Sequence, residues 1–549
     1  MSKPLTAFIQ QVLADFGINL SISFGVSSGV SSGISLPNHI TLSEQQGHLT
    51  NDSRTISQGD IFCAVIGQAE DGRQYIDSAI ESGASLILSE CQQQNDHGKV
   101  SVIALADKQV AVVSFYQLNS QLFALASAYY QSPQSKMTMI GITGTNGKTS
   151  TSHLLGQILS QCQSRCAIIG TNGAGLLSHL NDNSLTELAN TTPSATDLMQ
   201  FFHDFSEQGA SHLAMEVSSH ALEQKRVSAD IFDIAVFTNL SRDHLDYHGT
   251  MASYAKAKRQ LFTHDKQQVA VLNGDDTQAQ AWLTQWSTPE KLWLYGRSDN
   301  VCQHAQFVSA KHINHHSHGV SFTLNSHLGD IDIHSRLLGD FNIDNLLAVI
   351  SVLLIAEIPL AVIAEQVAKL KAIAGRMESF SAKVALSNTP TAVVDYAHTP
   401  DALEKALIAC RQHCHGKLYV VFGCGGDRDK GKRALMAQAA EKYADCLVVT
   451  SDNPRTEAPM SIIEDVVDGL ANKADITVIE QRKQAVLATL AKAQPEDVVL
   501  LAGKGHEDYI IIGQEKIAYN ERQVVMDFFN NIDSSQAAIP VAKPAGEQQ

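Results

Sequence analysis

Residues 137–160 read MTMIGITGTNGKTSTSHLLGQILS, and their pattern indicates the fold of the middle of the chain. The apolar run from Met137 to Ile142 predicts a buried strand, and the helical periodicity from Ser150 to Ser160 predicts a helix. The glycine-rich loop between them can aim backbone N–H groups at phosphate oxygens beside a helix N-terminus. We therefore predict a nucleotide-binding unit of strand, loop and helix within an α/β domain.

The loop itself, residues 143–149, reads TGTNGKT. Lys148 can neutralise the β- and γ-phosphates of a nucleotide, and Thr149 can bind Mg²⁺. Ile142 occupies the position at which the general pattern of such loops has its first glycine. We predict that the loop and the start of the helix contact ATP through Gly144, Thr145, Asn146, Gly147, Lys148, Thr149 and Ser150.

Apolar runs alternate with helical stretches on both sides of this unit. Such alternation predicts mostly parallel sheets that helices cover on both faces. In the last third of the chain it predicts a Rossmann-like, doubly wound sheet, whose ligands lie beyond the carboxyl ends of the strands. The runs that we assign to strands are residues 61–66, 212–217, 232–237, 269–272, 292–295, 391–395, 418–422, 446–450, 476–479 and 498–501.

Length and motif spacing divide the 549-residue chain into three domains. We expect a small α/β domain at residues 1–133, a central ATP-binding domain at residues 134–373 and a C-terminal Rossmann-like domain at residues 374–533. A Gly/Ser-rich stretch at residues 24–35 predicts an exposed insertion. The composition of residues 534–549 predicts a disordered tail.

The overall charge and composition restrict the class of partner. A formal net charge of −17 argues against nucleic acids and membrane surfaces, because both are anionic. The chain starts without a secretory signal, and no stretch approaches the roughly 18 apolar residues of a membrane span. The nine cysteines are scattered and odd in number, unlike a disulfide framework. We expect a cytoplasmic monomer that binds small molecules.

A second group of residues lies where a metal ion beside the phosphates is expected. Glu216 ends the strand predicted at residues 212–217, so its carboxylate lies at the edge where Mg²⁺ would bind. A helix cap or an ion pair is the alternative role for Glu216. His244 follows within residues 237–248, FTNLSRDHLDYH. Lys258 lies in a helical stretch, where a solvated lysine is the ordinary interpretation.

Residues 452–455, DNPR, follow a predicted strand at the edge where ligands bind, and a surface turn is their alternative role. Arginines here can bind a carboxylate. Asp452, Asn453 and Glu507 can accept hydrogen bonds from an ammonium group. Charges of both signs predict a site for an amino acid. The residues that we assign to it are Arg428, Asp452, Asn453, Pro454, Arg455, Gly503 and Glu507.

Together, the segments 143–149, 237–248 and 452–455 resemble the Mur ligase family, and the resemblance extends along nearly the whole chain. In the family's form of the phosphate loop, Gly144 is the earlier glycine. The resemblance implies three domains and an ATP-dependent ligase that works through an acyl phosphate. It implies that meso-diaminopimelate is added to the D-glutamyl γ-carboxylate of UDP-N-acetylmuramoyl-L-alanyl-D-glutamate. The amino-acid site would then bind the distal carboxylate and the distal ammonium of diaminopimelate.

The resemblance also implies roles for single residues. The lysine that matches Lys258 is carbamylated by CO₂ in the family, so that Thr149, Glu216, His244 and the Lys258 carbamate would hold Mg²⁺. Arg226 would neutralise a substrate carboxylate or the acyl phosphate. The residues that match the surface for the UDP-linked dipeptide are Ser53, Asn190, Thr191, Thr192, Ser218, Gln224 and Arg226. Those that match nucleotide-side positions are Asn273, Asn342 and Asn345, with Arg376 and Asp395 brought to ATP by closure of the C-terminal domain.

Three other interpretations stay open. An L-lysine-adding Mur ligase would leave Arg455 desolvated and unpaired, because lysine lacks the distal carboxylate. A folylpolyglutamate synthetase shares a similar glycine loop and modified lysine, but is not expected to carry residues 452–455 together with Ser53. A regulatory ATP-binding protein is the third interpretation. In such a protein, phosphate release would not require both the UDP-linked dipeptide and an amino acid. Gln68 stands where relatives often have a His, which leaves the uracil contacts open.

Overall fold

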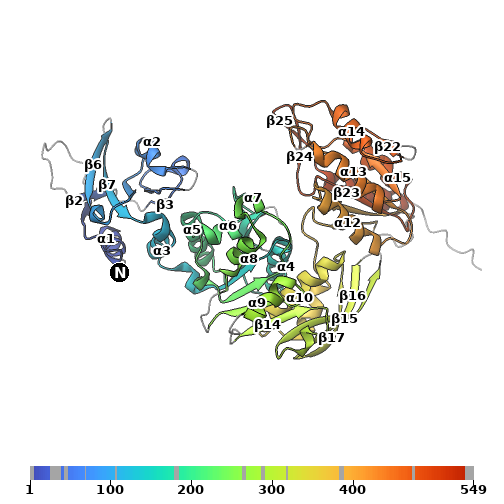
Figure 1. The fold of residues 1–549 in the computed structure, drawn as a ribbon, viewed down its shortest axis with the longest axis horizontal. Helices are drawn as coiled ribbons and strands as arrows, with labels where there is room; N and C mark the ends of the chain where they lie inside the picture. Colours follow the sequence, from blue (N-terminus) through green and yellow to red (C-terminus); the bar gives the residue numbers. More distant parts are fainter. Residues whose placement is uncertain are drawn as a thin grey trace, which may run out of the picture. The chain divides into compact units, whose positions relative to one another are not determined.

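The computed structural model describes residues 5–24, 39–42, 47–67, 70–105, 108–177, 185–262, 267–285, 291–316, 319–382, 389–428, 430–472 and 476–537 (Figure 1). The chain forms two compact units, Met1–Trp293 and Leu294–Gln549. Among the described residues, no helix has the length and apolarity that a membrane span requires. Gln68 and residues 25–35 of the predicted Gly/Ser insertion lie outside the described ranges.

The first unit begins with a small α/β region built on a five-stranded sheet. Its strands follow the order β3-β4-β5-β7-β6, and all neighbours are parallel except β6 and β7. The strand predicted at residues 61–66 is confirmed as β4. The elements are α1 (Leu5–Asp15), β1 (Ser21–Phe24), β2 (His39–Leu42), β3 (Leu49–Thr50), β4 (Ile61–Ala64), α2 (Ile76–Ser82), β5 (Leu86–Cys91), β6 (Val100–Leu105), β7 (Lys108–Tyr116) and α3 (Leu118–Tyr129).

The second sheet of this unit carries the phosphate loop. Its strands follow the order β10-β9-β11-β8-β12-β13, so β8, which leads into the loop, is central and paired in parallel with β11 and β12. The predicted strand and helix around the loop are confirmed as β8 and α4. The elements are β8 (Thr138–Thr143), α4 (Lys148–Gln161), β9 (Cys166–Gly170), β10 (Gly173–Leu176), α5 (Ala195–Glu207), β11 (His212–Glu216), α6 (Ser219–Glu223), β12 (Ile234–Phe237), α7 (Leu245–His248), α8 (Met251–Arg259), β13 (Val269–Asn273) and α9 (Thr277–Gln285).

The second unit starts within β14 and continues through an antiparallel ribbon and two helices. These elements are β14 (Leu292–Gly296), β15 (Phe307–His316), β16 (Gly319–Ser326), β17 (Gly329–Ser335), α10 (Asp340–Ile355) and α11 (Leu360–Val367). β15 pairs with β16, and β16 with β17, in antiparallel register. The long antiparallel hairpins were not predicted, because their half-exposed strands lack a continuous apolar run.

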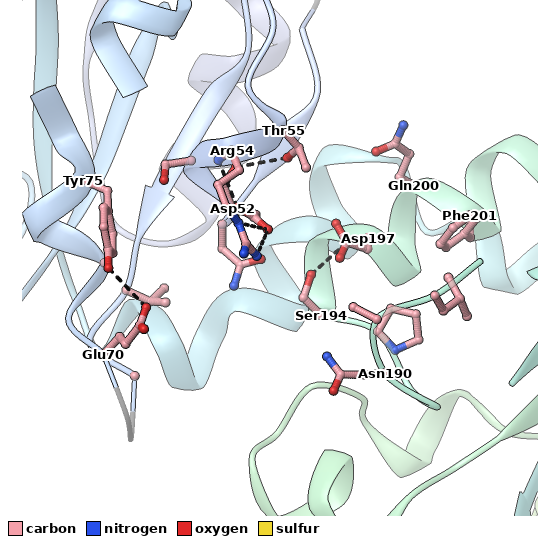
Figure 2. A pocket seen from close by; sticks show the side chains of 18 of the residues that line it. Asp52, Arg54, Thr55, Glu70, Tyr75, Asn190, Ser194, Asp197, Gln200 and Phe201 are labelled. Atoms are coloured by element: carbon pink, nitrogen blue, oxygen red, sulfur yellow. Dashed lines mark hydrogen bonds and ion pairs between the residues drawn. The ribbon is translucent and has the colours of Figure 1, made fainter. Parts of the chain in front are cut away.

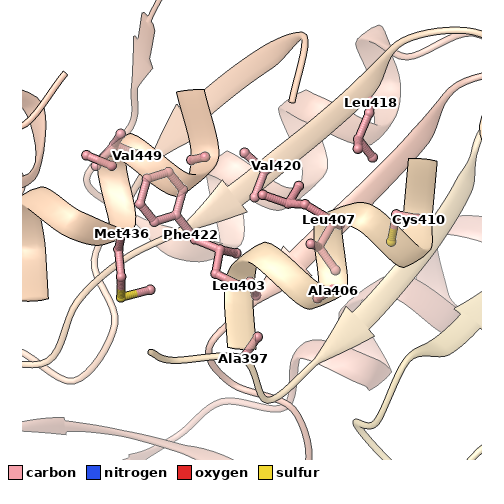
Figure 3. Packing of buried hydrophobic residues seen from close by; sticks show 14 of the residues in the cluster. Ala397, Leu403, Ala406, Leu407, Cys410, Leu418, Val420, Phe422, Met436 and Val449 are labelled. Carbon is pink, nitrogen blue, oxygen red and sulfur yellow. The ribbon is translucent and has the colours of Figure 1, made fainter. Parts of the chain in front are cut away.

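The last part of the chain forms a six-stranded sheet in the order β18-β19-β23-β20-β21-β22, with only β18 antiparallel to its neighbour. Leu403 and Leu407 of α12 pack with Phe422 of β20 in the core (Figure 3). The elements are β18 (Glu378–Phe380), β19 (Thr391–Asp395), α12 (Pro400–Gln412), β20 (Leu418–Phe422), α13 (Gly431–Tyr443), β21 (Cys446–Val449), α14 (Pro459–Asp468), β22 (Ile476–Val478), α15 (Arg482–Lys492), β23 (Val498–Ala502), β24 (Tyr509–Ile512), β25 (Glu515–Ala518) and α16 (Glu521–Ala537).

Two details concern the predicted boundaries. α16 runs to Ala537, so the first residues of the tail predicted at 534–549 are helical, and residues 538–549 lie outside the described ranges. The helix extends into this polar stretch because its apolar residues Val525 and Phe529 are anchored in the core. The domain limits at residues 133 and 373 stay predictions.

Candidate active site

The loop at residues 143–149 follows β8 directly and needs its two glycines. Gly144 has φ +152°, and a Cβ there would lie 1.8 Å from Thr238 Oγ1. Gly147, with φ +86°, caps the N-terminus of α4. Both positions use backbone conformations that side chains disfavour. The loop therefore brings the chain close to the segment after β12 and exposes the first N–H groups of α4 to an anion.

The segment after β12 fixes the loop by hydrogen bonds. The N–H groups of Thr145 and Asn146 donate to the carbonyl oxygen and to Oδ1 of Asn239, each at 2.9 Å. The Thr238 hydroxyl donates to the Asn146 carbonyl at 2.6 Å. Thr238 and Asn239 therefore hold the loop, although the sequence analysis gave them no role. Both residues directly follow the strand predicted at residues 232–237, and this position could have indicated that they contact the loop after the neighbouring strand β8.

Two lysine side chains donate hydrogen bonds to the same carbonyl oxygen of the loop. Lys148 Nζ and Lys258 Nζ donate to the Gly144 carbonyl at 2.9 Å and 2.8 Å. Lys258 is only 1% exposed, and its ammonium lies 4.3 Å from the centre of the Tyr254 ring. Burial, and then the charge of Lys148, lowers the pKa of Lys258 to about 6. The solvated surface lysine that composition suggested is therefore wrong, and Lys258 carries an uncharged amine near neutral pH.

Glu216 lies at the carboxyl end of β11, in register with Ile142 of β8. It is 1% exposed, and its two carboxylate oxygens accept hydrogen bonds from N (2.8 Å) and Oγ1 (3.1 Å) of Thr171. A Cβ at Gly170 would lie 2.1 Å from Oε1 of Glu216. Glu216 is therefore neither a helix cap nor a surface ion pair. Its carboxylate is buried and fixed beside the strand that leads into the phosphate loop.

His244 is more exposed and has a left-handed backbone, with φ +52°. Its Nε2 lies 3.4 Å from Asp243 Oδ2, and its ring packs against those of His220 and Tyr254. Within the described ranges, no three His, Cys, Asp or Glu side chains converge as a metal site. Thr149 lies in the first turn of α4, at the N-terminal end of that helix.

A pocket of about 930 Å³ lies in the first unit, between the first sheet and the segment that leads into α5 (Figure 2). Of the residues assigned to the UDP-linked dipeptide, Ser53 and Asn190 line it. Asp52 and Arg54 are paired at 2.7 Å, and Tyr75 donates to Glu70 at 3.3 Å. Burial is the main cause that raises the pKa of Asp197. The lining also includes Asn51, Thr55, Ser78, Pro193, Ser194, Gln200, Phe201 and Asp204.

The other assigned residues of this group make hydrogen bonds within the protein, and Thr192 bonds directly to Glu216. Thr192 is fully buried, its hydroxyl donates to the Glu216 carbonyl at 2.9 Å, and it accepts from Ser218 N at 3.0 Å. Thr192 therefore braces the site rather than presenting its hydroxyl to a ligand. Thr191 exchanges a hydrogen bond with Thr171, Ser218 caps α6, and Gln224 donates to the Tyr247 hydroxyl.

Arg226 donates one guanidinium N–H to the Thr192 carbonyl. Its Nε is buried and has no hydrogen-bond partner among the described residues. Burial lowers the pKa of Arg226, which means that its charge is poorly solvated. A half-buried cation with an unused, buried Nε donor favours an anion at this point of the site.

The residues assigned to the nucleotide side are mostly occupied by internal hydrogen bonds. Asn273 Nδ2 donates to the Thr238 carbonyl at 2.9 Å, so Asn273 supports the segment that holds the loop. In the second unit, Asn345 Nδ2 donates to Asn342 Oδ1 at 3.1 Å on α10. Asp395 accepts from two backbone N–H groups, and its burial raises its pKa. Direct ATP contacts by these residues stay predictions.

Arg376, in the same unit, lies with its guanidinium carbon 5.0 Å from the centre of the Tyr396 ring. Its Nε is buried and has no hydrogen-bond partner among the described residues. An arginine stacked on a tyrosine keeps the edge of its guanidinium for other acceptors. This arrangement is compatible with the predicted contact with ATP.

The loop 452–455 lies at the carboxyl edge of the last sheet and is bound by the hairpin β24–β25. Arg455 has φ +52°, its N–H donates to the Ile511 carbonyl at 3.0 Å, and its carbonyl accepts from Gly513 N at 2.7 Å. The Arg455 guanidinium donates to the Gly426 carbonyl at 2.8 Å. A Cβ at Gly425 would lie 2.9 Å from this guanidinium. Arg428 follows in the same glycine-rich turn and is exposed.

The amide of Asn453 is hydrogen-bonded through both its oxygen and its nitrogen. Its Oδ1 already accepts hydrogen bonds from Lys504 Nζ at 2.7 Å and from Ile511 N at 2.9 Å. Its Nδ2 donates to Glu507 Oε2 at 3.0 Å. Two donors therefore already occupy Oδ1, and the second N–H of Nδ2 is a further donor; the expected acceptor role of Asn453 toward an ammonium stays a prediction. Gly503 has φ +117°, and a Cβ there would lie 2.5 Å from Asp452 Oδ2.

The comparison with known families agrees with the order of these sites along the chain. Residues 47–130 match the Mur ligase family, catalytic domain; residues 142–353 match the Mur ligase middle domain; and residues 375–505 match the Mur ligase, glutamate ligase domain. The chain belongs to the Mur ligase family and has its three-domain α/β architecture.

Within that family, the chain is similar to one particular ligase. It is 44% identical, over 87% of its length and 95% of the relative's, to UDP-N-acetylmuramoyl-L-alanyl-D-glutamate--2,6-diaminopimelate ligase of Haemophilus influenzae. A solved structure of a ligase with this name has a TM-score of 0.65, 34% identity, and coverage of 88% and 95% of the two chains. The fold also resembles MurF ligase from Thermotoga maritima in complex with ADP, with a TM-score of 0.57, 18% identity, and coverage of 90% and 99%.

Proposed function

We propose that the protein is an ATP-dependent ligase that joins meso-diaminopimelate to UDP-N-acetylmuramoyl-L-alanyl-D-glutamate in the cytoplasm, during peptidoglycan precursor synthesis. The observation that carries this proposal is the 44% identity to a ligase named for these two substrates, over 95% of that ligase's length. The phosphate loop after β8 and the charged loop at residues 452–455 supply the two kinds of binding that such a reaction needs.

In the first step, an oxygen of the substrate's D-glutamyl γ-carboxylate bonds to the γ-phosphorus of ATP, and the bond to the β–γ bridging oxygen breaks. The products are an acyl phosphate and ADP. Because two anions approach each other, the site must compensate negative charge. Lys148 would exchange the Gly144 and Thr145 carbonyls, its acceptors at 2.9 Å and 3.0 Å, for phosphate oxygens. Arg226 would use its unpaired Nε for the carboxylate.

In the second step, the uncharged amine of diaminopimelate bonds to the acyl carbon. The bond from that carbon to the phosphate oxygen breaks, and inorganic phosphate and a proton leave. The reacting amine is positioned if the protein binds the distal carboxylate and the distal ammonium of the amino acid. Arg455 and Arg428 would bind the distal carboxylate, and Asp452 and Glu507 would bind the distal ammonium.

Lys258 is proposed to carry a carbamate, and the observed geometry supports this. Only an uncharged amine can attack CO₂, and burial keeps the pKa of Lys258 at about 6. The resulting anion would attract the Lys148 ammonium, which shares the Gly144 carbonyl with Lys258. Mg²⁺, when bound, would supply further positive charge beside the phosphates. Glu216, His244, Thr149 and the Lys258 carbamate would hold it.

An amino-acid panel in a coupled phosphate-release assay tests the proposed function. With ATP and the UDP-linked dipeptide, phosphate release should depend on the amino acid, and meso-diaminopimelate should exceed L-lysine and L-ornithine. A preference for L-lysine would support the lysine-adding alternative. Activity with a folate and glutamate would support a folylpolyglutamate synthetase, and ATP hydrolysis without both substrates would indicate a regulatory ATPase.

Replacing Arg455 with alanine should raise the KM for diaminopimelate and narrow the preference over lysine. Loss of a charged hydrogen-bond partner is worth about 1 to 3 kcal/mol, which corresponds to roughly 5- to 150-fold in kcat/KM. Arg411→Ala is the matched control, because Arg411 pairs with Asp445 at 2.8 Å on the surface of α12. An unchanged ratio of kcat/KM for the two amino acids in Arg455→Ala would refute the role of Arg455.

A further inference from the structure

Lys504 lies outside the charged loop at residues 452–455 but contacts two of its side chains, those of Asp452 and Asn453. No role was predicted for it. Its side chain is fully buried. Its ammonium donates to Asn453 Oδ1 at 2.7 Å, to the Tyr509 carbonyl at 2.9 Å and to Glu507 Oε2 at 3.0 Å. Asp452 Oδ1 lies 3.3 Å away. One buried cation therefore joins three side chains assigned to the amino-acid site to the hairpin β24–β25.

The first consequence concerns the orientation of the Asn453 amide. Both groups beside Oδ1, the Lys504 ammonium and the Ile511 N–H, can only donate, so the reversed amide would place N–H groups against two donors. Lys504 thereby keeps the Nδ2 of Asn453 on the side of Glu507. One of the two Nδ2 hydrogens remains for another acceptor, and a substrate carboxylate is such an acceptor.

The second consequence concerns the balance of charge. Arg482 is fully buried, its Nε and one terminal nitrogen bind Glu521 at 2.5 Å and 2.9 Å, and its other terminal nitrogen lies 4.0 Å from Asp452. Lys504 and Arg482 together compensate two of three carboxylates, those of Asp452, Glu507 and Glu521. One negative charge remains, which matches a single substrate ammonium.

We propose that Lys504 is a positioning residue that sets the preference for a diamino diacid over a diamine monoacid. It orients the Asn453 amide so that its N–H joins Arg455 in binding the distal carboxylate. It also leaves a single net negative charge, on Asp452 and Glu507, for the distal ammonium. This inference rests on the proposed function, because it concerns the amino acid of that reaction.

Lys504→Met tests the proposal, since methionine retains most of the apolar stem and removes the ammonium. The expected result is a KM for diaminopimelate that rises about tenfold or more, with a narrower preference over lysine. The KM for ATP should stay within about twofold. Lys516→Met is the matched control, because Lys516 lies 4.1 Å from the Tyr509 ring on the same hairpin but is exposed. A folded Lys504→Met enzyme with unchanged KM and preference overturns the proposal.

Asn453→Asp tests the same proposal without removing the buried cation. Aspartate keeps an acceptor toward Lys504 and Ile511 but replaces the outward N–H by an oxygen. We expect the KM for diaminopimelate to rise more than that for lysine, because the new oxygen repels the distal carboxylate. If Asn453 instead accepts from the ammonium, diaminopimelate binding will be retained, and the proposal is wrong. Wild-type enzyme without diaminopimelate-dependent phosphate release would refute the proposed function itself, whatever the variants do.

Discussion

Replacing Lys148 with alanine is expected to reduce phosphate release at saturating substrates by about 10³-fold or more. The loop at residues 143–149 would remain formed, because its anchors to Thr238 and Asn239 do not involve the lysine side chain. The loss would therefore come from uncompensated charge as the carboxylate approaches the γ-phosphate. Coupled phosphate release measures the rate, and the heat of ADP binding measures the contribution of Lys148 to binding.

Lys136→Ala is the control for this variant. Lys136 precedes β8, its side chain is 57% exposed, and its Nζ lies 3.5 Å from Glu207 Oε1. Its removal should leave the rate within about twofold, as surface ion pairs contribute little. A Lys148→Ala enzyme that retains more than a tenth of the wild-type rate would show that the loop does not act on the γ-phosphate.

Replacing Lys258 with methionine is expected to lower kcat by about 10²- to 10³-fold and to abolish incorporation of CO₂. The wild-type protein equilibrated with ¹³C-labelled CO₂ should give a carbamate carbon signal, which Lys258→Met should lack. Lys256→Met is the matched control, since Lys256 lies two residues earlier on α8 and is exposed. A carbamate signal that persists in Lys258→Met and disappears in Lys256→Met would move the modification to Lys256.

The pH dependence of the unmodified protein follows from the same burial. Folding lowers the pKa of Lys258 from 10.5 to about 6, so between these values the unfolded chain binds more protons than the folded chain. The free energy of unfolding attributable to Lys258 therefore rises with pH through this window. Denaturant titrations without CO₂ at pH 6 and pH 9 should show this rise in wild type and its loss in Lys258→Met. An equal change in the free energy of unfolding between pH 6 and pH 9 in both proteins would contradict the low pKa of Lys258.

Most strands around the two sites could be predicted because they are buried on both faces. β19 and β20 were predicted to the residue, and β8, β11, β13 and β23 within one residue at each end. Strands covered by helices on both sides need continuous apolar runs, and such runs are visible in a sequence. The antiparallel strands β15 to β17 alternate buried and exposed residues, and this weaker pattern was missed.

The site was predicted by residue type, but its internal contacts were not. The glycines, lysine and threonine of the phosphate loop follow from short-range spacing, since one turn must present several N–H groups to one phosphate. Thr238 and Asn239 hold that loop from about 90 residues further along the chain, because β12 pairs with β8. No local pattern records that pairing.

The order of the elements, the phosphate loop and the opposite charges at residues 452–455 can be recognised from short-range sequence patterns. The protonation state of Lys258 and the hydrogen-bond partners of Asn453 depend on contacts that form only in the folded chain. Burial makes Lys258 a weakly basic amine rather than a solvated cation, and Lys504, 51 residues after Asn453, occupies the oxygen of that amide. The lowered pKa of Lys258 and the hydrogen bond from Lys504 to Asn453 both require polar groups that are buried together away from water. Only folding brings these groups together, because they are distant in the sequence.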